Sequence, residues 1–343
     1  MIFKGKTILV TGGTGSMGST LVRRALSGEI GTPKKVIVFS RDEAKQHEMR
    51  MSYLHRREAT DEVIFRNFMN VLEFRIGDVR SYPEICAAVR DADIVINAAA
   101  LKQVPTCEYF PEQALLTNCV GAVNIVRAIQ ENRYKVETVI GISTDKACKP
   151  VNVMGMTKSL QERIFISANI LNPDTRFICV RYGNVLASRG SVIPLFLDQI
   201  ANGGPVTITD PSMTRFLLTL DQAADTVFTA LREARAGETY VPRAPSATVQ
   251  NIARALIGKK KVQTKTIGIR PGEKRHEIMV SDEEANHCVR RGSYFAILPM
   301  LPELKRKGAT EKNALKGEFS SADTVLGAKA TVDLLRRHGL VPA

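Results

Sequence analysis

Short apolar runs alternate with longer helix-prone segments along the first 145 residues of the chain. The runs that suit buried β-strands are Thr7–Val10, Lys35–Phe39, Val71–Ile76, Ile94–Asn97 and Thr138–Ile142. The segments between them carry helical patterns, among them one from about Pro111 to Asn132. Strands that alternate with helices in this way predict an α/β fold built on a Rossmann-like, doubly wound parallel sheet. Such sheets bind ligands beyond the carboxyl ends of their strands.

The second half of the chain is less regular. We expect a sixth strand at Arg176–Val180, a short strand at Val206–Thr209, and helices near 193–202, 221–236, 248–257 and 329–338. A length of 343 residues exceeds the usual size of a single domain. The pattern therefore predicts a large α/β domain over residues 1–185 and a smaller C-terminal α/β domain over 186–343, with segments exchanged between them.

The first apolar run leads directly into a glycine cluster, T-G-G-T-G-S-M-G, and then into a helical pattern. Strand, glycine turn and helix in this order are the context in which G-x-x-G-x-x-G indicates dinucleotide binding. Gly12 would allow the tight turn, Gly15 would let backbone amides approach a pyrophosphate, and Gly18 would let the helix pack on the strand. The phosphates would lie at the helix N-terminus, which favours anions. A glycine-rich turn that binds nothing is the simpler alternative.

Polar and small residues follow the next strands. After the second strand, a basic residue suits the 2′-phosphate of NADP, whereas an acid suits the free 2′-hydroxyl of NAD. Arg41 beside Ser40 favours NADP, and Asp42 keeps NAD open; an ordinary surface arginine fits the spacing equally well. After the third strand, Asp78 could bond an adenine edge or cap a helix. The alanines at 98–100 leave space for a flat group.

A row of reactive side chains, Ser143, Thr144, Asp145 and Lys146, follows the fifth strand. Lys158 comes twelve residues after Lys146, with Met154 four residues before it on the same helix face. A lysine near a nicotinamide could orient its ribose and lower the pKa of a neighbouring group. Asp145 and Lys146 supply an acid and a base at adjacent positions. Each could singly be a surface lysine or a helix cap, but together at a ligand-binding edge they favour function.

Composition and charge exclude several classes. The net charge is +13, yet the chain has no tryptophan and 6% aromatic residues, which disfavours base stacking with nucleic acid. Excess positive charge suits phosphorylated ligands or is simply a solvated face. Six cysteines are scattered without a C-x-x-C pair or a histidine at metal-ligand spacing, so we expect free thiols and no metal site. With no signal peptide or membrane-spanning run, a cytoplasmic location is expected.

Ten longer motifs occur in order between residue 7 and about residue 275. They are T-G-G-T-G-S-M-G, S-R-D-E, G-D-V-R, A-A-A-L-K-Q-V-P, S-T-D-K-A, N-V-M-G-M-T-K, R-Y-G-N-V, S-R-G-S-V-I-P-L-F, T-I-T-D-P-S-M-T-R-F and R-P-G-E-K. In these the chain resembles the extended short-chain dehydrogenase/reductases, and among them the UDP-N-acetylglucosamine 4,6-dehydratases of bacterial polysaccharide biosynthesis. The resemblance implies a lyase with tightly held NADP, a UDP-sugar substrate and a homo-oligomeric state.

The resemblance also implies a mechanism. A hydride leaves carbon 4 of the sugar, the resulting ketone acidifies the proton on carbon 5, water is eliminated, and the hydride returns to carbon 6. Lys146 would be the base at carbon 5 and Asp145 the acid at carbon 6. Thr144 would bond the 4-oxygen and Lys158 the nicotinamide ribose. Reprotonation of carbon 5 from the other face would add a 5-epimerisation.

The same resemblance implies that residues 1–185 form an NADP-binding domain and residues 186–343 a mainly substrate-binding domain. It also implies two sets of ligand-binding residues. The cofactor set is Gly12, Thr14, Gly15, Ser16, Met17, Gly18, Ser40, Arg41, Asp78, Val79, Ala98, Ala99, Ala100, Asn118, Ser143, Lys158 and Tyr182. The substrate set is Lys102, Asn184, Ser188, Arg189, Val192, Arg215, Arg270 and Glu273. Guanidinium groups suit diphosphate oxygens because they can bond them in pairs.

Met154 departs from the wider superfamily, in which a tyrosine at this position takes the proton of the 4-hydroxyl. A thioether has no proton to exchange, although some members of the dehydratase group also have methionine here. The base for the 4-hydroxyl is then Lys146, Asp145 through Thr144, or Tyr182, and we favour the first two. A nucleotide-sugar epimerase or reductase, and a noncatalytic NADP-binding regulator, are the competing functions.

Overall fold

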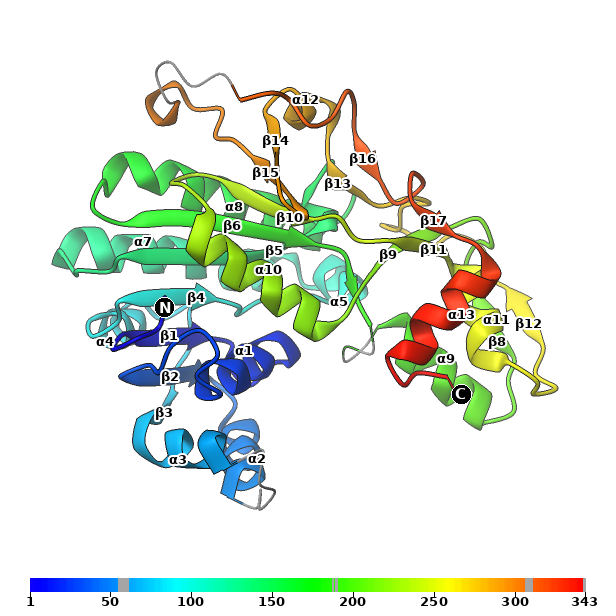
Figure 1. Cartoon of the computed structure of the whole chain (residues 1–343), viewed down its shortest axis with the longest axis horizontal. Coiled ribbons are helices and arrows are strands. Elements are labelled where there is room, and N and C mark those ends of the chain that lie inside the picture. Colours follow the sequence, from blue (N-terminus) through cyan, green and yellow to red (C-terminus); the bar gives the residue numbers. More distant parts are fainter. Residues whose placement is uncertain (55–61, 187, 189–190, 306–310, 342–343) are drawn as a thin grey trace.

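The computed structural model describes residues 1–54, 62–186, 188, 191–305 and 311–341. Its centre is a nine-stranded sheet in the order β14-β15-β10-β6-β5-β4-β1-β2-β3 (Figure 1). The first six strands are β1 (Thr7–Thr11), β2 (Lys35–Ser40), β3 (Leu72–Ile76), β4 (Ile94–Asn97), β5 (Thr138–Thr144) and β6 (Arg176–Tyr182). They pair in parallel throughout. The predicted Rossmann-like, doubly wound sheet is confirmed.

Helices cover both faces of this sheet because side chains along each strand point alternately to opposite sides. Ile8 and Val10 of β1 pack with α1 (Ser16–Leu26) and α10 (Leu220–Glu233). Leu9, between them, packs on the other face with helices α4 (Tyr82–Val89), α7 (Gly121–Asn132) and α8 (Val153–Leu171). The outer strands also contact α3 (Glu62–Val71), which follows α2 (Glu43–Leu54).

The helix expected from Pro111 to Asn132 is present, with one irregular turn. Helix α6 (Pro111–Ala114) continues through a π-helical turn (Leu115–Val120) into α7. A short helix, α5 (Val104–Tyr109), precedes it. The wider turn carries Asn118, whose side chain is fully buried. Turns of this kind often occur near functional sites, and this one lies under the loop that follows β4.

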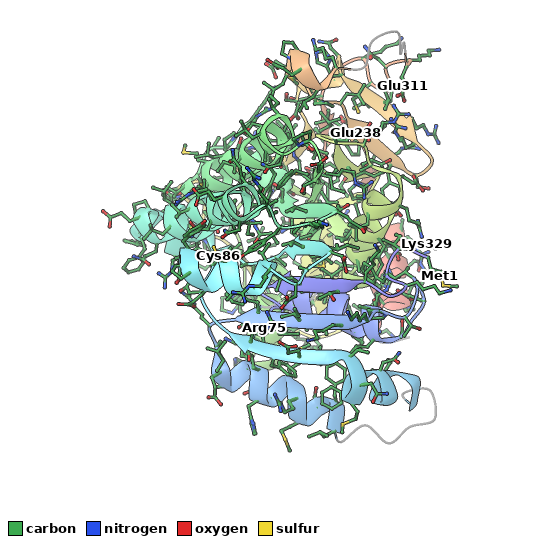
Figure 2. All side chains as sticks on the ribbon, turned by 90° about the vertical axis from the view of Figure 1, so that its left-hand side faces the viewer. Met1, Arg75, Cys86, Glu238, Glu311 and Lys329 are labelled. Carbon is green, nitrogen blue, oxygen red and sulfur yellow. The ribbon has the colours of Figure 1, made fainter. Side chains whose placement is uncertain are left out.

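Three strands from the second half of the chain extend the large sheet. β10 (Thr239–Pro242) runs parallel to β6, and β15 (Tyr294–Ile297) and β14 (Cys288–Arg291) add in antiparallel fashion. Arg291 of β14 contacts Glu238 at 3.0 Å and Glu311 at 3.1 Å, and both glutamates are labelled near the top of Figure 2. After residue 186 the chain thus returns to the large sheet and adds strands to it.

Most of the remaining elements form a smaller layer beside the sheet, on the right in Figure 1. Its helices are α9 (Val192–Ala201), α11 (Val249–Ile257) and α13 (Ala328–Arg337), which share one apolar cluster. Its strands are β7 (Asn184–Val185), β9 (Thr214–Leu218), β11 (Ser246–Thr248) and β17 (Val325–Leu326), with the pair β8 (Val206–Ile208) and β12 (Thr264–Thr266). The pair β13 (Ile278–Val280) and β16 (Phe319–Ser320) lies in the upper part of Figure 1 and packs in the apolar cluster of the large sheet. Short helices α12 (Asp282–Ala285) and Pro302–Leu304 complete the fold.

In the described ranges, no helix combines the length and the apolar character needed to cross a bilayer. The six cysteines are free thiols. The same ranges contain no group of histidine, cysteine, aspartate and glutamate side chains placed to hold a metal ion.

Candidate active site

A cavity of about 1010 Å³ opens at the carboxyl ends of the parallel strands. It lies where the strand order reverses between β1 and β4, the place at which open α/β sheets bind ligands. Its far side is formed by α9, β9 and the R-P-G-E-K loop. Among the predicted site residues that the structure describes, all but Asn118 and Asp145 line this cavity. Arg189 lies outside the described residues.

The glycine loop has the geometry that its spacing predicts. Gly12 has a φ of +64°, and a Cβ there would lie 2.7 Å from the backbone of Ala99. A Cβ on Gly18 would lie 2.4 Å from the carbonyl oxygen of Gly12, so helix and loop meet backbone to backbone. A Cβ on Gly15 would meet one neighbour, at 3.3 Å. Gly12 and Gly18 are therefore required by packing, whereas Gly15 leaves room on the cavity side.

Helix α1 begins in the cavity wall without a side-chain cap. Gly15 is its N-cap and supplies no acceptor, and the first turn has no acidic residue. The amides of the first turn of a helix have no partner within the helix, and the helix dipole is positive there. The loop and this helix end therefore fit the pyrophosphate of a dinucleotide.

Charges at the end of β2 fit a 2′-phosphate. Arg41 is exposed and lies 3.7 Å from Asp78, and Ser40 bonds Thr14 at 3.0 Å. Asp42 forms an ion pair with Lys45, whose hydrogen bond holds the pKa of Asp42 below its usual range. Asp42 and Lys45 both line the cavity, and the choice of NADP over NAD stays a prediction.

The alternative helix-cap role of Asp78 is wrong, because Ser81 is the N-cap of α4. Asp78 instead accepts a hydrogen bond from the backbone of Arg80 at 3.0 Å and pairs with the Arg80 guanidinium at 2.5 Å. Burial acts against the carboxylate, but Arg80 outweighs it and lowers the pKa of Asp78. Asp78 still lines the cavity beside Val79, so its adenine contact stays a prediction.

Asn118 lies beneath the cavity wall. Its amide oxygen accepts a bond from the Leu101 backbone at 2.9 Å, and its nitrogen donates to Leu101 at 3.0 Å and to Thr157 at 2.9 Å. These bonds fix the segment after β4, which includes the alanines at 98–100 and Lys102 of the lining. The contact of Asn118 with the cofactor stays a prediction, and its observed role is to support that wall.

Residues 143–146, the candidate acid–base residues, span the end of β5 and the 3₁₀ turn Asp145–Ala147 that follows it. Thr144 donates a hydrogen bond to Asp145 at 2.9 Å, and the ammonium of Lys146 lies 3.0 Å from the same carboxylate oxygen. Glu277, which precedes β13, approaches the Lys146 ammonium from the other side at 3.1 Å. Asp145 is fully buried and Glu277 is 2% exposed. The Lys146 ammonium therefore lies within 3.1 Å of two buried carboxylates, and Arg215 approaches Glu277 at 3.9 Å.

The surroundings separate the pKa values of these three groups. Burial, with the nearby Glu277, raises the pKa of Asp145 above its usual range against the opposing effect of Lys146. Burial also acts against the Lys146 ammonium, but Asp145 and Glu277 outweigh it and raise the pKa of Lys146. Burial acts to raise the pKa of Glu277, yet Lys146 and Arg215 outweigh it and lower that pKa. Lys146 is thus an ammonium at neutral pH, and Asp145 is the carboxylate better able to hold a proton.

Met154, Lys158 and Tyr182 line the cavity near this row. The Lys158 ammonium donates to the Ile142 carbonyl at 2.8 Å and to Gln161 at 2.9 Å, and burial lowers the pKa of Lys158 to about 8. Burial raises the pKa of the Tyr182 hydroxyl above its usual range. The phenol therefore stays protonated at neutral pH and does not form the phenolate that would act as a base. The sulfur of Met154 cannot exchange a proton.

Several buried oxygen atoms of the cavity wall have no hydrogen-bond partner within the described part of the chain. They belong to Thr117, Asn184, Ser191, Glu273 and Glu277. Buried polar atoms nearly always have partners, so this group of unpaired oxygens points to a polar ligand. Arg215 and Arg270 line the same region, together with Ser188 and Val192.

The sequence analysis missed Glu277. The residue lies four positions after Glu273, in an irregular segment before a three-residue strand. No periodicity places it, because its position depends on pairing between β13 and β16. The nearby R-P-G-E-K motif was the one available signal, since it already assigned the segment to the substrate.

Comparisons with known proteins agree with this geometry. A family model described as polysaccharide biosynthesis protein matches residues 8–299. UDP-glucose 4-epimerase of Rickettsia typhi is 44% identical over 301 residues, which cover 86% of this chain and 84% of that protein. The X-ray structure of Pen from Bacillus thuringiensis is similar over 99% of this chain and 100% of that one, with a TM-score of 0.88 and 32% identity. DesIV, a dTDP-glucose 4,6-dehydratase from Streptomyces venezuelae with NAD and TYD bound, shares the fold over 78% of this chain and 86% of that one, with a TM-score of 0.65 and 20% identity.

Proposed function

The chain belongs to the polysaccharide biosynthesis protein family, and we propose that it removes water from UDP-N-acetylglucosamine with the help of bound NADP. The product would be a UDP-4-keto-6-deoxy-N-acetylhexosamine for the synthesis of a surface polysaccharide or glycan. The family, and relatives that carry the name of a nucleotide-sugar epimerase, support a nucleotide-sugar enzyme of the epimerase or dehydratase type.

The observation that favours dehydration is the pair of buried carboxylates around Lys146. Epimerisation at carbon 4 alone requires one group that removes the proton of the 4-hydroxyl and returns it. Elimination across carbons 5 and 6 also requires a base for carbon 5 and an acid for the leaving hydroxyl. Lys146 and Glu277 line the cavity, and Asp145 lies directly behind Lys146; each carboxylate contacts the Lys146 ammonium, so these three residues supply the additional groups.

The chain's own residues fit a dinucleotide phosphate at the N-terminus of α1 and a 2′-phosphate beside Arg41. When bound, NADP would supply an acceptor for the hydride of carbon 4 and return it to carbon 6. Lys158 would hold the nicotinamide ribose from the end of β5, where its ammonium is already fixed by Ile142 and Gln161.

Asp145 and Thr144 can serve the 4-hydroxyl in place of the missing tyrosine. The Thr144 hydroxyl already donates to Asp145, so it can accept the proton of the sugar hydroxyl and pass its own proton to that carboxylate. The raised pKa of Asp145 suits a group that must hold this proton until it is needed. Asp145 then protonates the 6-hydroxyl, the bond between carbon 6 and oxygen breaks, and water leaves.

Lys146 is proposed as the base at carbon 5. Residues of the second half of the chain are proposed to bind the UDP-sugar. Arg215 lies 3.9 Å from Glu277 and lines the cavity with Arg270, so both can face the diphosphate. Lys102, Asn184 and Glu273 would bond the sugar, where the last two have unpaired buried oxygens.

The names of the curated relatives favour UDP-glucose 4-epimerisation as a second candidate. Purified protein is incubated with UDP-N-acetylglucosamine and separately with UDP-glucose, and the products are analysed by mass spectrometry, which detects loss of water, and by proton NMR, which detects inversion at carbon 4. Loss of one water from the sugar, without net formation of reduced NADP, is the expected result. A product of unchanged mass and inverted carbon 4 would replace this proposal by the epimerase, and an unchanged sugar with bound NADP would favour a regulator. The proton NMR spectrum of the first product would show whether carbon 5 is inverted.

A further inference from the structure

We propose that Glu277 is the proton acceptor behind Lys146: it receives, through the lysine, the proton that is removed from carbon 5 of the sugar. The inference rests on the proposed dehydration. It adds to that reaction a residue from the second half of the chain, outside the motifs that carry the family resemblance.

The structure fixes Glu277 at the lysine. One carboxylate oxygen lies 3.1 Å from the Lys146 ammonium, and the other is buried without a partner in the described part of the chain. The backbone of Glu277 is bonded on both sides to Ser321, at 2.9 Å to its hydroxyl and at 2.8 Å to its amide. Ser321 is itself bonded to Thr214 of β9 at 2.6 Å. These bonds hold the backbone of Glu277 against the residue that follows β16 and, through it, against β9.

Lys146 requires such an acceptor because an ammonium cannot remove a proton. Two carboxylates raise the pKa of Lys146, so it becomes a base only if it gives a proton to one of them. Asp145 already holds the proton of the 4-hydroxyl at this stage. Glu277 is the other carboxylate that contacts the Lys146 ammonium, at 3.1 Å, so it is the group placed to accept.

The proton balance closes over one turnover. The Lys146 ammonium first gives the proton of the N–H bond directed at Glu277 to the carboxylate oxygen, and the electron pair of that bond stays on the nitrogen as a lone pair. The resulting amine turns this lone pair toward the sugar and bonds the carbon 5 proton, while the electron pair of the carbon–hydrogen bond enters the enolate. Asp145 gives its proton to the leaving 6-hydroxyl. When carbon 5 is reprotonated, the relay runs in reverse, and Asp145, Lys146 and Glu277 regain their initial charges.

Glu277→Gln is the main test, because the amide keeps the shape but accepts no proton. We expect kcat to fall by about 10²–10⁴-fold with KM within a few-fold, and exchange of the carbon 5 proton with deuterated solvent to be lost. In protein labelled with ¹⁵N-lysine, the pKa of Lys146 should fall in the variant, without any substrate present. Added formate should restore turnover in Glu277→Ala, which a structural role would not explain.

Glu238→Gln is the matched control. Glu238 is also buried and ion-paired, with Arg291 at 3.0 Å, and it does not line the cavity. We expect normal turnover and normal exchange in this variant. If Glu277→Gln fails to fold, Glu277→Asp replaces it, and exchange at carbon 5 should slow because the carboxylate is withdrawn by one methylene.

The outcomes separate the two proposals. Wild-type protein that leaves UDP-N-acetylglucosamine unchanged would overturn the proposed function. Wild-type protein that dehydrates the sugar, together with a Glu277 variant that exchanges the carbon 5 proton at the wild-type rate, would overturn the role of Glu277 alone.

Discussion

Arg181 and Glu284 form a two-bonded ion pair, with distances of 2.7 and 2.8 Å, between residues 103 positions apart in the chain. Arg181 also bonds the carboxylate of Glu162 on α8 at 2.6 and 3.1 Å, and Glu162 accepts a hydrogen bond from Ser143. All four side chains are buried. Because Glu284 belongs to α12, directly after β13, this network holds the segment of Glu277 against the parallel sheet.

Arg181→Met should strongly destabilise the protein, because it leaves Glu162 and Glu284 buried without their cation. Removal of one partner from a buried ion pair typically costs about 3–5 kcal/mol. Urea denaturation followed by circular dichroism measures the loss. Arg127→Met is the control, since Arg127 pairs with Glu131 on the exposed side of α7, and exposed ion pairs contribute little to stability. Equal effects of the two substitutions would contradict the importance of the buried network.

Glu284 should contribute to acid unfolding. Burial acts to raise its pKa, but Arg181 outweighs burial and lowers the pKa of Glu284 from 4.5 to about 2. A carboxylate with a lower pKa in the folded state stabilises the fold above its unfolded pKa, and this contribution is lost as the pH falls from about 4.5 toward 2. Glu284→Gln can keep the capping contact with Ser281. In this variant the free energy of unfolding should depend less steeply on pH over this range. Parallel curves for variant and wild type would exclude the effect.

Gly18→Ala and Gly15→Ala should separate folding from cofactor binding. A Cβ on Gly18 would lie 2.4 Å from the Gly12 oxygen and 2.6 Å from Gly13, both backbone atoms. This overlap should cost about 1–3 kcal/mol and lower the melting temperature. Gly15→Ala meets one atom at 3.3 Å, so it should fold normally but bind reduced NADP more weakly in a fluorescence titration. If Gly15→Ala bound NADP like the wild type, the pyrophosphate would not lie against this residue.

Local patterns were sufficient to predict the sheet and most of its ligand edge. Ile8 and Val10 alternate with Leu9 across the two faces of β1, and a run of this kind indicates a buried strand before any tertiary contact is known. The glycine spacing predicted its loop for the same reason, because Gly12 and Gly18 meet within a few residues of each other.

The parts of the fold and of the site that depend on long-range pairing could not be predicted from the sequence. The addition of β10, β14 and β15 to the large sheet depends on contacts between distant segments, which leave no periodic signal. Glu277 reaches Lys146 only through this return of the chain. The helix-cap interpretation of Asp78 was wrong because α4 begins three residues later than it required, with Ser81 at the N-cap position.

Arg41→Ala should weaken NADP binding more than NAD binding. Arg41 is an exposed cation at the cavity wall, and loss of a charged bond to a phosphate typically costs about 1.5–3 kcal/mol, or roughly 10- to 150-fold in affinity. Calorimetric titration with each cofactor measures the ratio. Arg80→Ala is the control, because Arg80 also pairs with Asp78 but does not line the cavity. An unchanged ratio in Arg41→Ala would favour NAD as the cofactor.

Met154→Tyr tests how the 4-hydroxyl loses its proton. Met154 is 4% exposed, packs with Cys107 and Ala114, and lines the cavity, so a larger ring has space on one side only. We expect turnover to persist or rise, because Thr144 and Asp145 already provide a path for the proton. Met154→Leu, which keeps the volume, should behave like the wild type.

Thr144→Val makes the same test sharper, because it removes the hydroxyl that links the sugar to Asp145. Turnover should fall by about 10²–10⁴-fold in the wild-type background, the usual loss when a proton-transfer group is removed. In the Met154→Tyr background the new phenol can take the proton instead, so the second substitution should recover much of the rate. A double variant as slow as Thr144→Val would show that the tyrosine cannot reach the 4-hydroxyl. If Thr144→Val alone turned over at the wild-type rate, the proton would leave by another path, with Lys146 as its first acceptor.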